Sequence, residues 1–388
     1  MTLLQRIVDR LTGSRRTLPQ LTLILIAGAA VYANSFRVGF VMDDYAVISS
    51  YGPRGVVDIL LHGGPRRVAD ATFALNYALH GQEVAGYHAV NLLIHLAAAV
   101  TLYYLAAASL AALRQSFSLH GEESAGERLV PFAAVLLFAV HPLQTQAVTY
   151  IVQRYTCLAT LLYLLAAFLF IRTRLAFDRG GLSPRTLAAA GGTVAAGVLA
   201  LGSKQIAATL PLMLLMLEVL IFRGRLLGRR FFILCGTALL LAAAALLFAW
   251  RALSPAEMLT ALNNATSEHH NLSRSGYFFT QLRVVGTYLR LLVLPYGQSI
   301  FHDYPFSRSF LSLPVVAAAA LHLSLLGCCA ALIRSSGRRL RDGDAANGPL
   351  LRLAGAGFAW FYVALIIESS FFPITDWIFE HQIGRAHV

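Results

Sequence analysis

Charged residues are scarce in this chain of 388 residues. Asp, Glu, Lys and Arg make up 13% of it and hydrophobic residues 57%, whereas a soluble globular domain carries about 25% charged residues. So few charges cannot cover a water-facing surface of this size. The high apolar content also excludes an intrinsically disordered chain, which would be rich in polar residues. The composition therefore predicts a membrane protein.

Cysteine and lysine are also rare. The four cysteines, Cys157, Cys235, Cys328 and Cys329, all lie inside apolar runs, which predicts neither a disulfide framework nor a metal-binding spacing. Lys204 is the only lysine among 31 Lys and Arg residues. A net charge of +12 would suggest nucleic-acid binding in a soluble protein. Here the arginines stand between apolar runs, as in cytoplasmic loops of membrane proteins, so we expect no nucleic-acid partner.

What the chain has instead is a series of apolar runs, many of about 17–25 residues, the length that crosses a bilayer as a helix. They predict an all-α fold, a polytopic transmembrane helical bundle resting in the lipid bilayer. We expect about nine spans, at 18–38, 87–111, 129–143, 155–172, 186–202, 206–222, 231–250, 311–333 and 350–371.

The arginines indicate the orientation. Most of them stand in short loops that share one side of the membrane if the N-terminus is cytoplasmic, as the positive-inside rule requires. This orientation gives a basic cytoplasmic segment at 1–17 and two long outer loops, at about 39–86 and 251–310, carrying short helices. The segment 279–296 is amphipathic and contains Arg283 and Arg290, so we expect a helix in the outer interface rather than a tenth span.

Two adjacent carboxylates, Asp43 and Asp44, follow the first span directly. Loop acids are usually only solvated, but acids are few in this chain, and a charge at membrane depth is costly and usually functional. A carboxylate at this position suits a general base that activates a hydroxyl nucleophile. It also suits a ligand of a divalent cation.

A polar stripe follows on the second span, where His88, Asn91 and His95 share one helix face. Two interpretations are open for this stripe. The side chains can hydrogen-bond to neighbouring helices, or the two histidines can bind a metal, for which the nearby sequence offers no third ligand.

Further polar residues stand at the outer ends of later spans. A polar turn begins at His141, includes Gln144 and runs to Arg154, and such backbone is tolerated at this depth where it lines a watery cavity. Lys204 lies in a tight outer turn and, as a compact charge, suits a phosphate contact. Arginines such as Arg290 suit bidentate contacts with a lipid phosphate. The alternative is simple anchoring to phospholipid head groups.

Together these segments resemble the membrane region of the transmembrane tetratricopeptide-repeat O-mannosyltransferase-like proteins, a group of GT-C glycosyltransferases. The resemblance runs from about 31 to 382. It rests on the Asp43-Asp44 pair, an arginine-containing stretch at 67–81, the stretch 87–95, the His-Pro-x-Gln-Thr turn from His141, Ser203-Lys204 and the stretch 288–305.

The resemblance implies a membrane glycosyltransferase that moves a sugar from a polyprenyl-phosphate donor to a hydroxyl acceptor on a periplasmic protein or glycan. Its active site would face the periplasm across a bacterial inner membrane. The catalytic role carries over onto Asp43 and Asp44, and we take Asp44 as the base. No cofactor is otherwise implied, although a divalent cation is left open. The positions implied to line the same cavity and bind the donor phosphate or substrate are Arg67, His88, His141, Gln144, Arg154, Lys204, Arg290 and Tyr304.

The chain departs from this family at three positions. Val68 stands where the family often has proline, Gln205 where a glutamate commonly follows the lysine, and Gln146 where eukaryotic members have a glutamate. The loss of two acids leaves a catalytically degenerate membrane scaffold open. A transporter or flippase of a lipid-linked or anionic substrate is the other alternative, although the paired repeats it favours are not evident.

The stretch 372–381 matches a family segment that continues into further spans and tetratricopeptide repeats. We therefore expect such repeats downstream of this sequence, with 18–382 as the GT-C-like domain. The last residues, 383–388, resemble a translated sequencing adapter, which predicts a non-native tail on a fragment.

Overall fold

The computed structural model describes residues 13, 16–51, 54–226, 273–299, 304–367 and 369. Within these ranges the fold is all helical, with 13 α-helices and no strand. The helices are α2 Thr17–Tyr32, α3 Asp43–Ser49, α4 Val56–His62, α5 Arg67–His80, α6 Val84–Ser116, α7 Ala125–Val140, α8 Thr145–Thr149, α9 Arg154–Gly180, α10 Pro184–Leu201, α11 Leu210–Phe222, α14 Arg274–Val293, α15 Leu313–Arg341 and α16 Gly348–Leu365. The all-α prediction is confirmed.

Seven described helices are long and apolar enough to cross a membrane, and an eighth candidate is a bent pair, Ala125–Val140 with Pro142–Thr149. These eight correspond to eight of the nine predicted spans. The remaining one, 231–250, lies outside the described residues, as do 251–272 and 300–303 of the loop 251–310, nearly all of the basic N-terminal segment and the chain end at 372–388. The segment 279–296, which we expect in the outer interface, lies mostly within α14. This helix is not among the seven candidate membrane-spanning helices.

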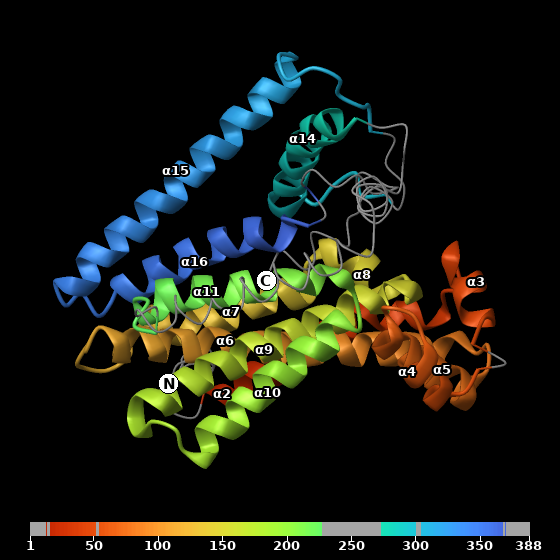
Figure 1. Ribbon diagram of the computed structural model, residues 1–388, viewed down its shortest axis with the longest axis horizontal. Helices are drawn as coiled ribbons and strands as arrows, with labels where there is room; N and C mark the ends of the chain where they lie inside the picture. The colour runs from red at the N-terminus through yellow and green to blue at the C-terminus, as the bar shows by residue number, and fades with distance from the viewer. Residues whose placement is uncertain are drawn as a thin grey trace, which may run out of the picture.

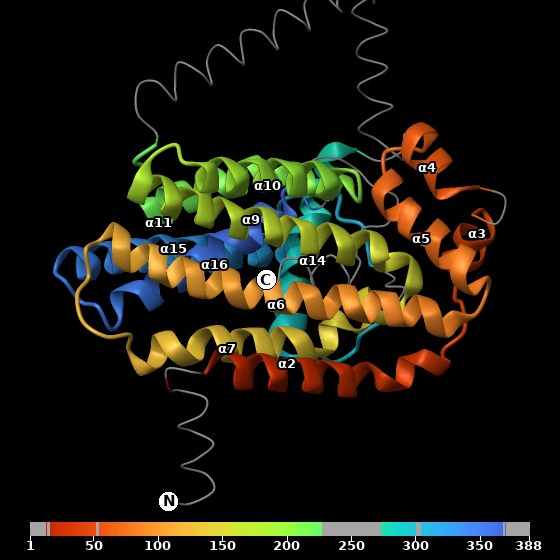
Figure 2. The ribbon, with the colours of Figure 1, turned by 90° about the horizontal axis from the view of Figure 1, so that it is seen from below.

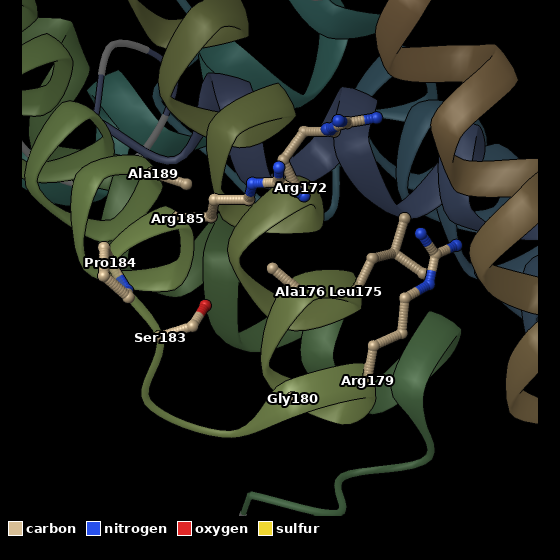
Figure 3. A pocket seen from close by; sticks show the side chains of 9 residues that line it. All are labelled: Arg172, Leu175, Ala176, Arg179, Gly180, Ser183, Pro184, Arg185 and Ala189. Atoms are coloured by element: carbon tan, nitrogen blue, oxygen red, sulfur yellow. The ribbon is translucent and has the colours of Figure 1, made fainter.

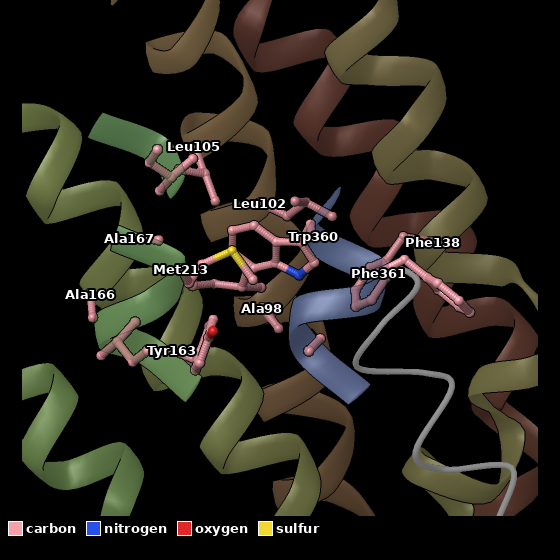
Figure 4. Packing of buried hydrophobic residues seen from close by; sticks show 14 of the residues in the cluster. Ala98, Leu102, Leu105, Phe138, Tyr163, Ala166, Ala167, Met213, Trp360 and Phe361 are labelled. Carbon is pink, nitrogen blue, oxygen red and sulfur yellow. The ribbon is translucent and has the colours of Figure 1, made fainter. Parts of the chain in front are cut away.

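The long helix α6 forms the centre of the bundle. It lies between α2 and α7 on one side and the antiparallel pair α9 and α10 on the other, with α11 and α16 completing the packing (Figure 1, Figure 2). Large side chains interdigitate between these helices, and Tyr163 of α9 meets Trp360 of α16 edge to face, with ring centroids 5.6 Å apart (Figure 4). Ala98, Ala166 and Ala167 lie among them, and small residues of this kind let membrane helices approach closely.

Helix α15 leaves this bundle. It crosses away from α16 at an angle and meets α14 at its far end (Figure 1). His322 of α15 bonds to the carbonyl of Leu282 on α14 over 2.8 Å and to the hydroxyl of Tyr362 on α16 over 3.1 Å. This histidine therefore connects the three helices at one point.

The bend after α7 has a local cause. His141 has extended backbone angles (φ −65°, ψ 130°), as expected for a residue before proline, and Pro142 has no N–H to continue the helix. The chain turns by 50° and continues as η2 (Pro142–Gln144), α8 and η3 (Ile151–Gln153) before α9 begins. We call this segment, 141–153, the broken turn. The helix-compatible polar turn predicted here is confirmed.

The segment between α2 and α6, which the sequence predicts to be the first outer loop, folds into the helices α3, α4 and α5 at one end of the bundle (Figure 1). Ile48, Ile59 and Phe73 form a separate buried cluster there with Tyr87 of α6 and Ile151 of the broken turn. Residues far apart in the sequence are thus packed around the broken turn, and the polar residues of this end are held by that packing.

Candidate functional site

The two adjacent carboxylates have different environments. Asp44 is 1% exposed, and its Oδ2 and Oδ1 accept hydrogen bonds from the N–H groups of Val41 (3.0 Å) and Val152 (2.8 Å). Asp43 is exposed, and its backbone N–H donates to the Tyr150 hydroxyl over 3.3 Å. Asp44 therefore attaches the loop to the broken turn, whereas the carboxylate of Asp43 is accessible to a substrate.

The backbone before this pair has an uncommon conformation. Met42 has φ 46° and ψ −117°, and a positive φ is unfavourable for a residue other than glycine. Such strain persists only where the surrounding structure fixes it and is frequent at functional sites. Here the hydrogen bonds of Asp44 to Val41, which directly precedes Met42, and to Val152 of the broken turn provide that constraint.

Burial and charge set the proton affinities around the pair. Burial raises the pKa of Asp44 above its usual value of 3.8, although its two N–H contacts and nearby His88 lower it in part. Burial also raises the pKa of Tyr150 to about 12, and the charges of Asp43 and Asp44 act in the same direction. The Tyr150 hydroxyl therefore keeps its proton at neutral pH and can serve as a hydrogen-bond donor beside the two acids.

His88 lies buried behind this loop. Its Nε2 donates to the carbonyl of Val38 over 2.9 Å, while its Nδ1 is buried and has no hydrogen-bond partner among the described residues. The side chain thus supports the loop that carries the carboxylates instead of facing solvent.

Arg154 is completely buried and connects three helices. Its Nε donates to Asn91 Oδ1 (2.7 Å), and its terminal nitrogens donate to Asn76 Oδ1 (2.8 Å) and to the carbonyls of Thr72 (3.2 Å) and Tyr87 (3.1 Å). The guanidinium also lies over the ring of Phe73, 4.3 Å from its centroid. All its partners are neutral groups of α5 and α6, so Arg154 positions the helices around the site and does not line an open cavity.

Asn91 and His95 of the polar stripe on α6 are hydrogen-bonded to neighbouring segments. Asn91 also donates to the carbonyl of Ile151 over 3.1 Å, and His95 Nε2 bonds to the carbonyl of Ala139 over 3.1 Å. Within the described residues no group of three or more His, Cys, Asp or Glu side chains could hold a metal ion. The arrangement favours hydrogen bonding between helices as the role of this stripe.

Lys204 and the arginines of α5 gather where α5 meets the end of α10. The Val68 N–H donates to the carbonyl of Gly202 over 2.9 Å, and Arg66 Nε donates to Gln205 Oε1 over 3.3 Å. Lys204 Nζ donates to Thr156 Oγ1 over 2.9 Å. Arg67 is exposed and its contacts are to backbone carbonyls, including that of Gly64 at 3.3 Å. This junction concentrates positive charge at the same end of the bundle as Asp43.

The remaining predicted residues lie in the broken turn, in α14 and in the segment after α14. His141 accepts from the Leu143 N–H at Nδ1 (3.2 Å), and its Nε2 donates to the Leu292 carbonyl (3.1 Å). Arg290 donates to the carbonyl of Tyr296 over 3.0 Å. Tyr304 shares a 3.2 Å hydrogen bond with Thr287. Gln144 is buried in the broken turn itself.

A cavity of about 220 Å³ opens beside the carboxylate loop. It is lined by the loop itself at Val38 and Val41, by the broken turn at Thr145, Gln146, Thr149 and Tyr150, and by Gln298 and Ser299. Gln298 is fixed by a 3.1 Å hydrogen bond from its Nε2 to the carbonyl of Pro142. The three segments that meet here are those with the polar residues singled out in the sequence.

Several residues at this end were not predicted individually. Tyr150 and Gln298 line the cavity, and Asp70 accepts hydrogen bonds from the hydroxyls of Tyr51 (2.7 Å) and Tyr155 (2.6 Å). Asp70 and Gln298 stand inside stretches that carried the resemblance, and Tyr150 stands in the polar turn that runs from His141 to Arg154. Their contacts span up to 156 residues of sequence, so only the fold could single them out.

Known proteins share part of this sequence. Over 182 residues the chain is 34% identical to protein O-mannosyl-transferase Tmtc3 of Drosophila melanogaster, a stretch that is 40% of this chain and 19% of that protein. It is 30% identical over 183 residues to protein O-mannosyl-transferase TMTC1 of Homo sapiens, a match that covers 42% of this chain and 19% of that protein. It is 31% identical over 176 residues to protein O-mannosyl-transferase TMTC1 of Mus musculus, which covers 40% of this chain and 17% of that protein.

The matched part is therefore less than a fifth of each of these relatives. No protein-family model matches the chain, and no solved structure does. The chain is a multi-span membrane protein with distant homology to protein O-mannosyltransferases.

Proposed function

We propose that this protein is a membrane glycosyltransferase that transfers a sugar from a polyprenyl-phosphate donor to a hydroxyl group of a protein or glycan. The observation that carries the proposal is the exposed carboxylate of Asp43 next to the cavity of about 220 Å³. The distant homology to protein O-mannosyltransferases supports the same reaction class.

In the proposed reaction the acceptor oxygen attacks the anomeric carbon of the sugar. The bond between that carbon and the phosphate oxygen breaks, and the phosphate leaves with the bonding electron pair. Asp43 takes the acceptor proton, because its carboxylate is accessible, whereas both oxygens of Asp44 already accept backbone N–H groups. We therefore assign the role of base to Asp43 instead of Asp44, which we took first as the base, and give Asp44 a positioning role.

Positive charge is needed where the phosphate departs, because its negative charge grows in the transition state. Lys204 and Arg67 are accessible at the junction of α5 and α10, and we assign them this electrostatic role. Tyr150 provides a hydroxyl donor beside Asp43. Arg154, His88 and His141 act by fixing the segments that surround the cavity.

The proposal includes a location. With the N-terminus in the cytoplasm, the Asp43 loop lies on the outer face of the membrane, which in a bacterium is the periplasmic face. The donor then reaches the site from the outer leaflet and the acceptor from the periplasm.

The direct test is transfer from polyprenyl-phosphate [³H]mannose to protein in membranes that contain the full chain. We expect labelled protein with the wild-type chain and none with the double variant Asp43→Asn/Asp44→Asn expressed at the same level. Equal labelling in the two preparations would refute the proposed function. Uptake of the donor into sealed proteoliposomes without any transfer would instead support a transporter.

A further inference from the structure

A second, larger cavity lies at the opposite end of α9 from the carboxylate loop. It has a volume of about 580 Å³ and is bounded by the last turns of α9 and the first turns of α10 (Figure 3). Three arginines line it, Arg172 and Arg179 from α9 and Arg185 from α10, with Leu175, Ala176 and Ala189 among its apolar walls. Figure 3 shows Arg185 directed across the pocket toward Arg172, with Arg179 rising on the other side.

The positive charge of this pocket is not compensated by the described residues. No carboxylate lines it. Two acids of the neighbouring helices, Asp178 of α9 and Glu218 of α11, are both engaged by a different arginine, Arg174, at 3.0 Å and 2.7 Å. Within the described part of the chain Arg172 and Arg185 make no hydrogen bond or ion pair, and Arg179 contacts only the neutral Gln115, at 3.4 Å. The three side chains are exposed, and guanidinium groups that gather around one pocket repel each other less when an anion lies between them.

The position of the pocket restricts the choice of anion. It lies between the end of one candidate membrane span, Ile151–Gly180, and the start of the next, Pro184–Leu201. The ends of membrane spans meet the headgroup region of the bilayer, which contains the lipid phosphates. Arginine binds phosphate through two parallel N–H contacts, and basic pockets between membrane helices are known sites for anionic lipid head groups. The apolar walls next to the arginines can contact the first part of an acyl chain.

We propose that this pocket is a phosphate-binding site, held by Arg172 and Arg185 with Arg179, on the opposite side of the membrane from the candidate active site. Its ligand is a phosphate group carried by an anionic lipid or by a soluble phosphate ester. The inference uses only the geometry of α9 and α10 and does not depend on the proposed transferase activity.

The test uses the full chain, purified in detergent and stripped of lipid. It is titrated separately with phosphatidylglycerol, phosphatidylcholine and glycerol 3-phosphate, and bound molecules are counted by native mass spectrometry. The variant is R172Q/R185Q. The matched control is R334Q/R338Q, which removes two exposed arginines of α15 that likewise make no hydrogen bond or ion pair among the described residues.

We expect the wild-type chain and the control to bind phosphatidylglycerol with equal affinity and more tightly than phosphatidylcholine. The pocket variant should bind it at least about tenfold more weakly, since each charged hydrogen bond lost costs about that factor. Binding of glycerol 3-phosphate with the same dependence on the two arginines would support the site and identify a soluble ligand. The proposal would be overturned if R172Q/R185Q bound phosphatidylglycerol and glycerol 3-phosphate as tightly as the wild-type chain does. It would also be overturned if the wild-type chain bound neither of these two compounds.

Discussion

The Nε of Arg154 donates a hydrogen bond to Asn91 Oδ1 over 2.7 Å and thereby connects the start of α9 to α6. The same guanidinium reaches Asn76 of α5, so a single buried cation fixes the first outer loop to the bundle. The carboxylates and the cavity are built on these elements. The geometry of the candidate site therefore depends on a residue that is completely buried.

Replacing this cation should destabilise the protein. Arg154→Met leaves Asn91 and Asn76 with buried acceptors that have lost their donor, which costs about 1–3 kcal/mol for each group. We expect the variant to unfold at a clearly lower temperature in detergent, measured by intrinsic fluorescence. The exposed Arg338→Gln variant is the control and should unfold like the wild-type chain. Equal unfolding temperatures for all three proteins would contradict the structural role of Arg154.

The buried carboxylate of Asp44 should make stability depend on pH. Burial raises the pKa of Asp44 in the folded protein above 3.8, so the folded state binds its proton more tightly than the unfolded state. As pH rises from about 3.8 through the folded-state pKa, the unfolded state ionises first, and the free energy of unfolding falls. Above the folded-state pKa this decrease in the free energy of unfolding no longer grows with pH. The unfolding temperature of Asp44→Asn should lack this component, and identical pH profiles for the two proteins would contradict it.

The charge of Lys204 should influence donor binding. Lys204→Gln removes a compact cation from the junction of α5 and α10, and we expect the KM for the polyprenyl-phosphate donor to rise about tenfold. Lys204→Arg keeps the charge and should restore part of the loss. Initial transfer rates at varied donor concentration give the KM, with Arg338→Gln as the control for loss of charge alone. An unchanged KM in Lys204→Gln would exclude this role.

The sequence predicts the spans well because bilayer-length apolar runs leave little choice of structure. It also locates the broken turn, because Pro142 cannot continue a helix. It does not distinguish Asp43 from Asp44, since adjacent residues share the same local pattern. Their difference arises from the contact of Asp44 with the N–H of Val152, 108 residues away, and that contact exists only once α3 packs on the broken turn.

The role of Arg154 illustrates the same limit. Its place at the outer end of a span agrees with a phosphate ligand, and the resemblance implies a cavity-lining position. The fold surrounds it instead with neutral acceptors from α5 and α6. Helical periodicity identifies Asn91 as part of a polar face, but no local pattern indicates that its partner comes from α9.

The most direct measurement compares transfer of [³H]mannose by three single variants, Asp43→Asn, Asp44→Asn and Asp58→Asn, at matched expression. Asp58 is an acid of the same outer loop that pairs with Arg54 and His62, so it controls for the loss of a loop charge. We expect Asp43→Asn to lower the rate at least about 100-fold, as for a lost general base, with its unfolding temperature unchanged. Asp44→Asn should lower both the rate and the unfolding temperature, and Asp58→Asn should leave the rate as it is. Wild-type transfer by Asp43→Asn would contradict the account.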